Sequence, residues 1–576
     1  MINQDLSKIF YKMALYLDME GDKVPFKSIA LKKVAVNLEA LNEDVESIYK
    51  KGGLKALKEI PGVGEGIAFK IEEYLKTGKI KELTALKKKT PVDLEELIGI
   101  EGLGPKKIKI LYQKLGIKNI KNLEKAAKIH KIAPLFGFGQ KTEDNILEGI
   151  EFLKRSKGRF LLGEILPKVS EIIAEFKNLK EVKQISEAGS IRRRKETIGD
   201  ADILIASSNP KKVIDYFASL RGIVKIWAKG STKASVRMSE GFDVDLRVLP
   251  EKQFGSALQY FTGSKEHNIA LRKIAINRGL KLSEYGLFKG SKMIAGENEK
   301  EIYEKLGLRW IPPEMRENNG EIELGLKNKL PKLIKLGDIK GDLHCHSHWG
   351  AGKRLIKEIA EAAMAMNYEY IGISDHTKFL HIEHGLDEKQ LAKQRKEIDK
   401  INLKFKIKNL KFRILHGCEA NIMSDGSIDI SDEALAKLDY VIAGVHSQMK
   451  IAKDEMTKRI IRAMENPNVD IISHPTGRIL NQREEYEIDF DKILRVAKET
   501  GTVLEINANP YRLDLNDQNI RKAKEIGVKM IINSDSHHKD QLNLMEYGVS
   551  QARKGWAEKK DIINCWSVKK MLSMLK

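Results

Sequence analysis

The chain has 576 residues, too many for one ordinary domain, and 42% of them are apolar, enough to fill the cores of two to four compact units. Lysine and arginine outnumber aspartate and glutamate by 102 to 81, and the resulting net charge of +21 favours a partner with dense negative charge. Nucleic acid is the first expectation for that partner, and an acidic membrane surface is the second.

The cysteines and the N-terminus bear on the compartment of the protein. Cys345, Cys418 and Cys565 lie far apart without a Cys-x-x-Cys pair, so neither a disulfide framework nor a thiolate zinc site is expected. The N-terminus lacks a basic start followed by a long apolar run, and no run of about 18 apolar residues indicates membrane insertion. We therefore expect a cytoplasmic protein that does not contact membranes.

Residues 1 to about 150 have apolar residues at helical spacing and lysine-rich faces, which predicts an all-helical region. Three similar segments, IPGVGEG from Ile60, IEGLGPKK from Ile100 and LFGFGQKT from Leu135, each precede a predicted helix. Glycine pairs allow a close backbone approach, and the helix that follows offers unpaired N–H groups to a phosphate oxygen. One copy alone is more simply a tight turn between helices, but three copies in a basic chain favour contact with phosphate.

These segments resemble helix-hairpin-helix motifs, which hold the DNA backbone without reading its sequence. The glycines that this resemblance assigns to DNA binding are Gly62, Gly64, Gly102, Gly104, Gly137 and Gly139.

From about residue 159 to 250 the runs ADILIAS, GIVKIWA and FDVDLRVL alternate with helical stretches, which predicts a mixed sheet. Asp200 and Asp202 stand at positions i and i+2 of a strand and therefore face the same side. Asp245 on a neighbouring strand would complete a cage for two Mg²⁺ ions, which suits phosphoryl transfer. A lone Asp-x-Asp is more often a turn or a helix cap, so the three carboxylates together carry the argument.

The segment AGSIRRRKETIGDADIL, with YFTGSKEHN further on, resembles the nucleotidyltransferase palm and nucleotide pocket of family X DNA polymerases. The resemblance implies that the aromatic pair Tyr260 and Phe261 lies beside the sugar, where it would exclude a 2′-hydroxyl and select deoxynucleotides. The alternative for this pair is packing in the core. The implied nucleotide-binding set is Arg159, Gly189, Ser190, Arg193, Gly199, Tyr260, Phe261, Gly263, Asn268 and Arg272.

The same resemblance makes the first 85 residues look like the family's lyase domain, which removes a 5′-deoxyribose phosphate through a lysine Schiff base. Lys70 stands where that catalytic lysine falls. An amine must be partly neutral to attack an aldehyde. Gly66 replaces a supporting lysine of the vertebrate pattern, and the alternative for Lys70 is a solvated or phosphate-contacting lysine.

Beyond residue 338, the strand candidates YIGISD, FRILHG, YVIAGV, DIISHP, TVLEIN and KMIINSD alternate with helical stretches, which predicts βα units and a barrel. Eleven of the thirteen histidines fall between His344 and His538, many of them at strand ends. His344 and His346 would share one face of a strand. Nitrogen and oxygen ligands of this kind suit Mn²⁺, Zn²⁺ or Fe and the hydrolysis of a phosphoester. The candidate ligands are His344, His346, Asp375, His376, Glu419, His446, His474, Asp535 and His537.

This pattern resembles the polymerase and histidinol phosphatase (PHP) domain, a distorted TIM-like α/β barrel. The resemblance implies a metal-dependent 3′-5′ exonuclease or abasic-site endonuclease. Two positions depart from the family pattern: Ala351 replaces a usual ligand aspartate, and Asn421 stands where a second carboxylate often occurs. We therefore predict weak hydrolase activity unless His348 compensates. Cys345 and Cys418 are interpreted as small core residues.

The patterns and the resemblances divide the chain into six segments. They are a lyase-like helical domain (1–85), a fingers-like helix-hairpin-helix region (86–155), an α+β palm (156–255), a small thumb (256–318), a linker (319–338) and the PHP domain (339–576).

We therefore predict a template-directed DNA polymerase that fills short gaps in base excision repair and acts as a monomer on gapped or primed DNA with deoxynucleoside triphosphates. Mg²⁺ or Mn²⁺ is expected in the palm, and Mn²⁺ or Zn²⁺ in the PHP domain. Two alternatives are a nuclease whose palm only clamps DNA and a non-catalytic scaffold that binds DNA ends. The three palm aspartates argue against the first alternative, and the nucleotide pocket argues against the second.

Overall fold

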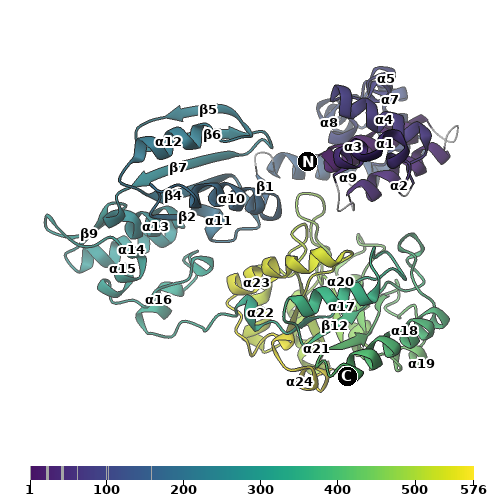
Figure 1. Ribbon diagram of the computed structural model, residues 1–576. Helices are drawn as coiled ribbons and strands as arrows, with labels where there is room; N and C mark the ends of the chain where they lie inside the picture. Colours follow the sequence, from purple (N-terminus) through teal and green to yellow (C-terminus); the bar gives the residue numbers. More distant parts are fainter. Residues whose placement is uncertain are drawn as a thin grey trace. The chain divides into compact units, whose positions relative to one another are not determined.

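Helices joined by short turns make up the first of the two units into which the chain divides in the computed structural model (Figure 1). The first unit holds residues 1–157 with 481–483, and the second holds residues 158–480 and 484–576. The structure describes residues 2–20, 25–39, 44–60, 62–98, 100, 103–156 and 159–575. No described helix is both long enough and apolar enough to span a membrane.

The helices of the first unit confirm the all-helical prediction for this region. Their bounds are α1 (Ile2–Glu20), α2 (Pro25–Glu39), α3 (Val45–Leu57), α4 (Glu65–Thr77), α5 (Lys81–Lys89), α6 (Leu94–Ile98), α7 (Pro105–Leu115), α8 (Ile120–Lys128) and α9 (Gln140–Ser156). Pro105 opens α7 and Gly116 closes it with a φ of 66°, as expected of residues that fit a helix start and a helix end. A single apolar core, which includes the buried Phe10, Ile71 and Leu111, runs through the unit.

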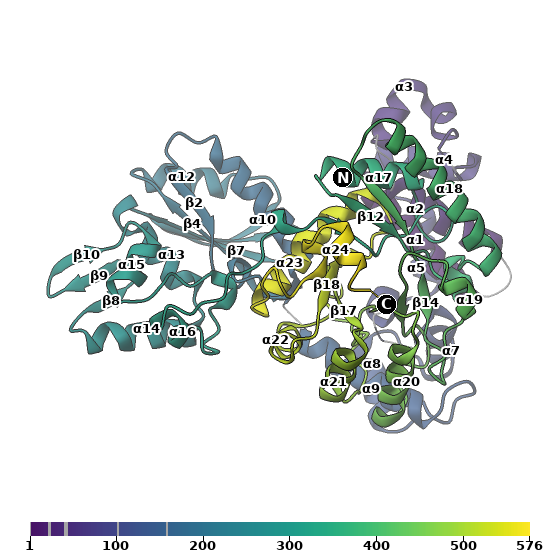
Figure 2. The same cartoon turned by 90° about the horizontal axis from the view of Figure 1, so that it is seen from below.

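A five-stranded mixed sheet opens the second unit and forms the palm (Figures 1 and 2). Its strand order is β2-β4-β7-β6-β5; β4 and β7 are parallel, and the other neighbours are antiparallel. The strands are β2 (Gln184–Glu187), β4 (Asp200–Ala206), β5 (Ile223–Lys229), β6 (Lys233–Met238) and β7 (Asp243–Leu249), beside the short pair β1 (Phe160–Leu161) and β3 (Thr197–Ile198). The helices are α10 (Leu162–Lys177), α11 (Gly189–Arg192) and α12 (Pro210–Ala218). The three strand predictions for this region are confirmed.

The two faces of the palm sheet differ in chemistry. On one face Val244 and Leu246 pack with Val213 and Phe217 of α12 in an apolar cluster. Side chains alternate along a strand, so Asp243, Asp245 and Arg247 point to the opposite face. We call this side, which also carries Asp200 and Asp202, the carboxylate face.

The thumb follows the palm and contains helices and a small antiparallel sheet. Its elements are η1 (Glu251–Gln253), α13 (Phe254–Thr262), α14 (Lys265–Asn277), β8 (Lys281–Ser283), β9 (Gly286–Lys289), β10 (Lys292–Ala295), α15 (Glu299–Lys305) and η2 (Pro313–Met315). Glu299 accepts hydrogen bonds from Arg192 of the palm and from the buried Arg316. A buried carboxylate shared by two guanidiniums in this way ties the thumb to the palm.

The segment 319–338, predicted as a linker, contains α16 (Glu321–Leu326) and η3 (Leu336–Asp338). The buried carboxylate of Glu321 lies 2.7 Å from Nδ1 of the buried His267, so the start of this segment packs on the thumb.

Parallel strands form the PHP barrel (Figure 2). They are β11 (Gly341–Asp342), β12 (Tyr370–Ile373), β13 (Arg413–His416), β14 (Glu419–Asn421), β15 (Ile442–Gly444), β16 (Ile471–Ile472), β17 (Val503–Asn507) and β18 (Met530–Asn533). The larger helices around them are α17 (Ile356–Ala365), α18 (Glu388–Ile407), α20 (Lys453–Glu465), α21 (Phe490–Thr500), α22 (Asp517–Ile526) and α23 (Met545–Lys554). The shorter ones are η4 (His381–Glu383), α19 (Asp432–Leu435), η5 (Lys539–Leu544), η6 (Ile563–Cys565) and α24 (Val568–Leu572). Each of the six predicted strands is present.

The strands fall into two sheets, β11-β12-β13 and β14-β15-β16-β17-β18, that isolated bridges join. His376 pairs with Glu419 on one side of the barrel, and Cys345 pairs with Ser536 on the other. These bridges close the distorted barrel and bring the polar ends of its strands together. Cys345 and Cys418 are buried in its apolar core.

The PHP domain contacts the palm within the second unit. The guanidinium of Arg478 donates to both carboxylate oxygens of Glu196, at 2.7 and 3.2 Å, and the Gln551 amide donates to the same carboxylate at 2.7 Å. Leu513 and Tyr547 of the PHP domain belong to the apolar cluster of the palm. The two domains therefore share both a charged contact and part of a core.

Candidate active sites

The glycine turns of the first unit share one geometry. The N–H groups of Val63, Leu103 and Phe138 each donate to the carbonyl three residues earlier, at 2.9 to 3.1 Å. Gly62 and Gly137 have φ values of 82° and 80°, which glycine adopts without strain.

In each turn the second glycine, Gly64, Gly104 or Gly139, directly precedes a helix, namely α4, α7 or α9. Gly102 lies outside the described residues. The turns therefore present helix N-termini, which suit a phosphate oxygen.

Three carboxylates meet on the carboxylate face of the palm. Asp202 of β4 is in register with Asp245 of β7, and Asp200 is in register with Asp243. Lys233 Nζ lies 2.8 Å from Asp245 Oδ2, and the Ser235 hydroxyl donates to the other oxygen of Asp245. The three carboxylates predicted to bind metal therefore lie on two neighbouring parallel strands. Lys233 and Ser235 hold the carboxylate of Asp245 in place.

The electrostatics of this trio fit a cation. Burial, together with the charges of Asp200 and Asp245, raises the pKa of Asp202 to about 7. Carboxylates that repel one another in this way are stabilised by a divalent cation, for which carboxylate oxygens are hard ligands. Gly189, with a φ of 57°, passes so close to the Asp202 carboxylate that a side chain at this position would collide with it.

Two arginines of the predicted nucleotide pocket flank the trio. The Arg159 guanidinium donates to the Thr197 hydroxyl at 2.9 Å and to the Thr197 carbonyl at 2.6 Å, next to Gly199. Arg193 lies 3.0 Å from Glu317 and donates to the Thr262 carbonyl beside Gly263. Arg193 therefore bridges palm and thumb at the predicted triphosphate site. The neighbouring Ser190 is partly exposed in α11.

The aromatic pair of the predicted pocket lies at the end of α13. The rings of Tyr260 and Phe261 meet edge to face at 5.1 Å, and Arg247 lies over the Phe261 ring at 4.5 Å. Neither ring is fully buried, whereas Asn268 is buried with its amide bonded to the Tyr260 carbonyl at 2.7 Å. Arg272, one helical turn after Asn268 in α14, is partly exposed.

Lys70 lies in α4 of the first unit, the helix that directly follows Gly64. Its Nζ donates to the Gly66 carbonyl at 3.0 Å and lies 3.1 Å from Glu82 Oε2. Lys27 shares the same carboxylate at 2.5 Å. The amine is therefore paired and must leave Glu82 before it can attack an aldehyde.

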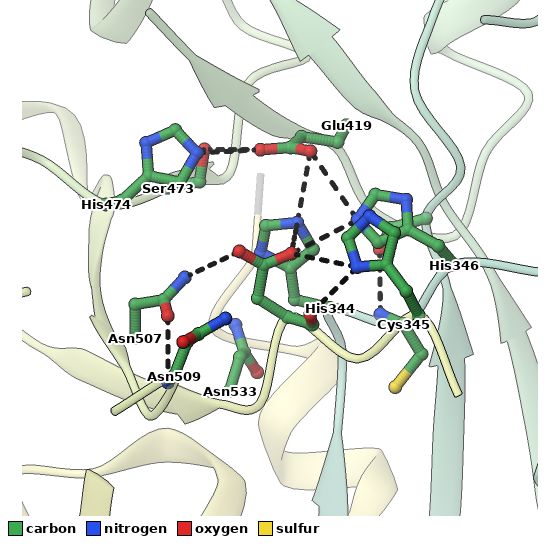
Figure 3. A network of polar contacts seen from close by, with 12 residues as sticks. His344, Cys345, His346, Glu419, Ser473, His474, Asn507, Asn509 and Asn533 are labelled. Atoms are coloured by element: carbon green, nitrogen blue, oxygen red, sulfur yellow. Dashed lines mark hydrogen bonds and ion pairs between the residues drawn. The ribbon is translucent and has the colours of Figure 1, made fainter. Parts of the chain in front are cut away.

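Glu419 lies at the centre of the histidine cluster in the PHP barrel (Figure 3). Its Oε2 lies 2.8 Å from His376 Nδ1 and 3.2 Å from His344 Nε2. Its Oε1 lies 3.2 Å from His446 Nε2 and 3.0 Å from His474 Nε2. One carboxylate thus joins imidazoles from four different strand ends.

Asp535 completes the cluster from the end of β18. Its Oδ1 lies 3.3 Å from His346 Nε2, and the His346 and His537 rings stack at 4.1 Å. The candidate ligands form three groups, and within each group the ligand atoms lie within 4.8 Å of one another. The groups are His344, His346 and Asp535; His346, His376 and His537; and His376, Glu419 and His446.

The donor atoms of the cluster fit metal ions. Within the described chain, His344 Nε2, both ring nitrogens of His346 and Glu419 Oε2 are buried without a hydrogen bond. Burial alone would lower the pKa of His344, but the carboxylates around it, Glu419 first among them, hold it well above its usual value. Burial alone would raise the pKa of Glu419, but the nearby imidazoles hold it well below its usual value. Buried polar atoms left without hydrogen bonds are expected where a metal binds.

Comparison with known proteins shows which families the parts of the chain match. The family models that match are a helix-hairpin-helix domain (residues 1–80), a SAM-like helix-hairpin-helix tandem (94–151), the DNA polymerase beta thumb (257–317) and the PHP domain (342–509). The DNA polymerase/3′-5′ exonuclease PolX of Bacillus subtilis strain 168 is 40% identical over 580 residues, which cover 100% of both chains. The chain belongs to the PolX family of DNA polymerases. A probable phosphatase of Thermoanaerobacter sp. strain X514 is 41% identical over 134 residues, 22% of this chain and 52% of its own length.

Three residues considered as ligands from the sequence lie outside the three ligand groups of this PolX chain. The Asp375 carboxylate accepts hydrogen bonds from Ser347 and from the Gln394 amide, so it belongs to none of the three ligand groups. His348 lies beside Glu397 at 4.0 Å instead of among the imidazoles, so it does not replace the ligand missing at Ala351. His474 reaches Glu419 but lies outside the three groups.

Two residues support the candidate ligands in a role that the sequence did not predict. Glu505 Oε1 lies 2.7 Å from His344 Nδ1, and Asn421 Oδ1 lies 2.8 Å from His446 Nδ1. Each fixes the ring so that Nε2 faces the centre. Glu505 is the one charged residue in the otherwise largely apolar strand TVLEIN, and this could have indicated a functional role. Asn421 was read as a departure from the family pattern, and here it supports a ligand.

Proposed function

We propose that this PolX chain is a template-directed polymerase that fills short gaps in DNA with deoxynucleotides during base excision repair. The observation that carries the proposal is the register of Asp202 with Asp245 on parallel strands, with Asp200 on the same face. Divalent ions, Mg²⁺ or Mn²⁺, would activate the attacking oxygen and neutralise phosphate charge when bound by these three residues.

The remaining groups of the palm would position the nucleotide. Arg159 and Arg193 flank the carboxylates and suit the oxygens of a triphosphate, because a guanidinium binds phosphate through two parallel hydrogen bonds. Arg193 must leave Glu317 of the thumb before it can bind a triphosphate. The partly exposed edge of the Tyr260 and Phe261 pair would lie against the sugar.

Primer extension by the full chain on DNA with a one-nucleotide gap tests this proposal. We expect addition of one deoxynucleotide with Mg²⁺ or Mn²⁺ and little addition of a ribonucleotide. DNA binding without extension under both metals would leave only a DNA-binding scaffold.

We also propose that the PHP domain hydrolyses DNA from the 3′ end, because its three ligand groups survive the loss of the aspartate at position 351. Mn²⁺ or Zn²⁺ held there would activate water for attack on phosphorus. The chain's own contribution is to hold the imidazoles: Glu505 orients His344, and Asn421 orients His446.

Exonuclease assays on the full chain with Mn²⁺ test this second proposal. Activity is expected to disappear in His344→Ala and to rise in Ala351→Asp, since one more carboxylate strengthens the cluster only if the rest of it binds metal. Digestion that persists in His344→Ala would assign the hydrolysis elsewhere.

A further inference from the structure

One tryptophan of the palm sheet is partly exposed to solvent. Trp227 lies on β5, the edge strand of the sheet (Figure 1), and is 47% exposed. Its indole Nε1 donates to Asp243 Oδ1 at 2.9 Å, and the Lys225 ammonium lies over the ring at 3.8 Å from its centroid. The guanidinium of Arg237 lies 5.2 Å from the same centroid and forms a bidentate pair with Asp243. These contacts therefore hold the ring in place, and Trp227 stays nearly half exposed.

The position of Trp227 ties it to the carboxylate face. Asp243, which accepts from the indole, is in register with Asp200 and stands two residues from Asp245. Two residues along a strand span roughly 7 Å. Between Ile226 and Ala228 the pairing of β5 with β6 shifts, so Trp227 sits at a bulge. A bulge at a sheet edge changes the direction of a side chain. Here it accompanies the orientation of the Trp227 indole toward Asp243.

The surroundings of the ring match one kind of ligand. A large exposed aromatic ring fixed by a hydrogen bond loses little conformational freedom when it stacks on another ring. Lys225 forms no ion pair with a described residue, so its charge is available for a phosphate. Aromatic rings beside cations are the usual means of binding unpaired nucleotides, because every base has a face to stack.

We propose that Trp227, with Lys225, forms a stacking platform for an unpaired nucleotide at the 3′ end of the primer strand. The inference rests on the proposed polymerase function, because the strand whose 3′ oxygen reaches the carboxylates is the primer. The base of a paired terminus is held by its base pair and by stacking on the duplex, so it cannot turn onto the indole. An unpaired terminal base is free to stack on the indole, and its phosphate would then come close to the Lys225 ammonium, which lies over the same ring.

The test compares two gapped DNA substrates that bind the full chain in the absence of divalent metal. One has a paired primer end, and the other has three unpaired nucleotides at that end. Trp227→Ala should weaken binding of the unpaired end about tenfold, as expected for the loss of one stacked base, and change binding of the paired end less than twofold. Trp227→Phe, which keeps a ring, should retain most of the affinity.

Ile226→Ala is the matched control, because Ile226 is 44% exposed on the same strand and pairs with the buried Val236 on the other face. It should bind both substrates as the parent does. Equal losses on both substrates, or a loss only when unpaired nucleotides are placed on the template strand, would overturn the platform. Primer extension by the parent distinguishes failure of the polymerase proposal from failure of the stacking platform. If the parent binds gapped DNA but never extends the primer, the polymerase proposal fails. The binding comparison then still decides whether Trp227 stacks on an unpaired nucleotide.

Discussion

The palm and the PHP domain arrange their candidate active-site residues in opposite ways. The palm carboxylates lie on an open sheet face, where Asp200 is exposed and Asp245 is held by Lys233 and Ser235. Most of the PHP imidazoles and carboxylates are buried, and four of the imidazoles contact Glu419 directly. The palm site is thus built of like charges, and the PHP site of opposite ones.

This difference concerns what holds each site together before metal binds. Three carboxylates repel one another, so the palm site favours a proton on Asp202 and gains most from an added cation. In the PHP cluster the charges of Glu419 and the histidines already compensate, and its outer residues fix the rings. We therefore expect the palm to depend on metal for its charge balance, and the PHP domain to depend on its supporting hydrogen bonds for its geometry.

The largest expected effect comes from removing one palm carboxylate. Asp245→Ala should lower primer extension about a thousandfold or more, because several kcal/mol of transition-state charge stabilisation are lost with an incomplete metal site. Single-turnover extension on gapped DNA measures the change. Affinity for the gapped DNA in the same variant should stay near that of the parent, since the hairpin turns are untouched. Extension above a few per cent of the parent rate would remove Asp245 from the metal site.

The next effect concerns a support in the PHP domain. Asn421→Ala removes the oxygen that orients His446, and loss of such a partner typically lowers metal affinity about 10- to 100-fold. Calorimetric titration of the full chain with Mn²⁺ measures it. Asn421→Asp keeps an oxygen at this position and serves as the control. Unchanged affinity in Asn421→Ala would mean that the ring is held by packing alone.

A smaller effect follows from the pKa of Asp202. The folded chain without metal keeps this proton up to about pH 7, whereas an unfolded chain releases it near pH 4, so stability falls as pH rises between these values. Asp202→Asn should therefore raise the thermal midpoint in EDTA by a few degrees at pH 8 and leave it unchanged at pH 4. Calorimetry at the two pH values is the measurement. An equal rise at both values would point to packing and not to charge.

The last prediction concerns Lys70 in the first unit. Borohydride should trap a covalent adduct of the full chain with an incised abasic site, and Lys70→Ala should abolish it. Glu82→Gln should increase trapping several-fold, because the amine no longer has to leave an ion pair. Lys27→Ala, which removes the other cation on Glu82, is the control and should not increase trapping. Trapping that is unchanged in Lys70→Ala would transfer the role to another lysine.

Local patterns predicted much of this molecule. The apolar runs of the palm and barrel became strands because each run carries its own periodicity, and the glycine turns became helix starts for the same reason. Asp200 and Asp202 share a face by the period of two. The sequence could not predict the register of the strands. The pairing of Asp202 with Asp245 depends on which strands become neighbours.

The PHP site shows a second limit. The strand predicted through His344 and His346 ends at Asp342, and the bridge of Cys345 to Ser536, far along the chain, keeps both rings directed inward. His474 and Asp535 have φ values of 29° and 54°, which the surrounding structure imposes on residues that rarely adopt them. Contacts between distant segments fix these side chains, so spacing alone could name the ligands but not their supports.

The contacts between the palm and the PHP domain determine whether either domain can be studied after truncation. Arg478 stands four residues after His474 in the same loop and reaches across to Glu196, which precedes Asp200 by four residues. A chain cut between thumb and barrel would break the ion pair of Arg478 with Glu196 and expose Leu513 and Tyr547 to water. Deleting either half therefore damages the half that remains, so that single substitutions in the whole chain separate the two activities more cleanly than truncation does.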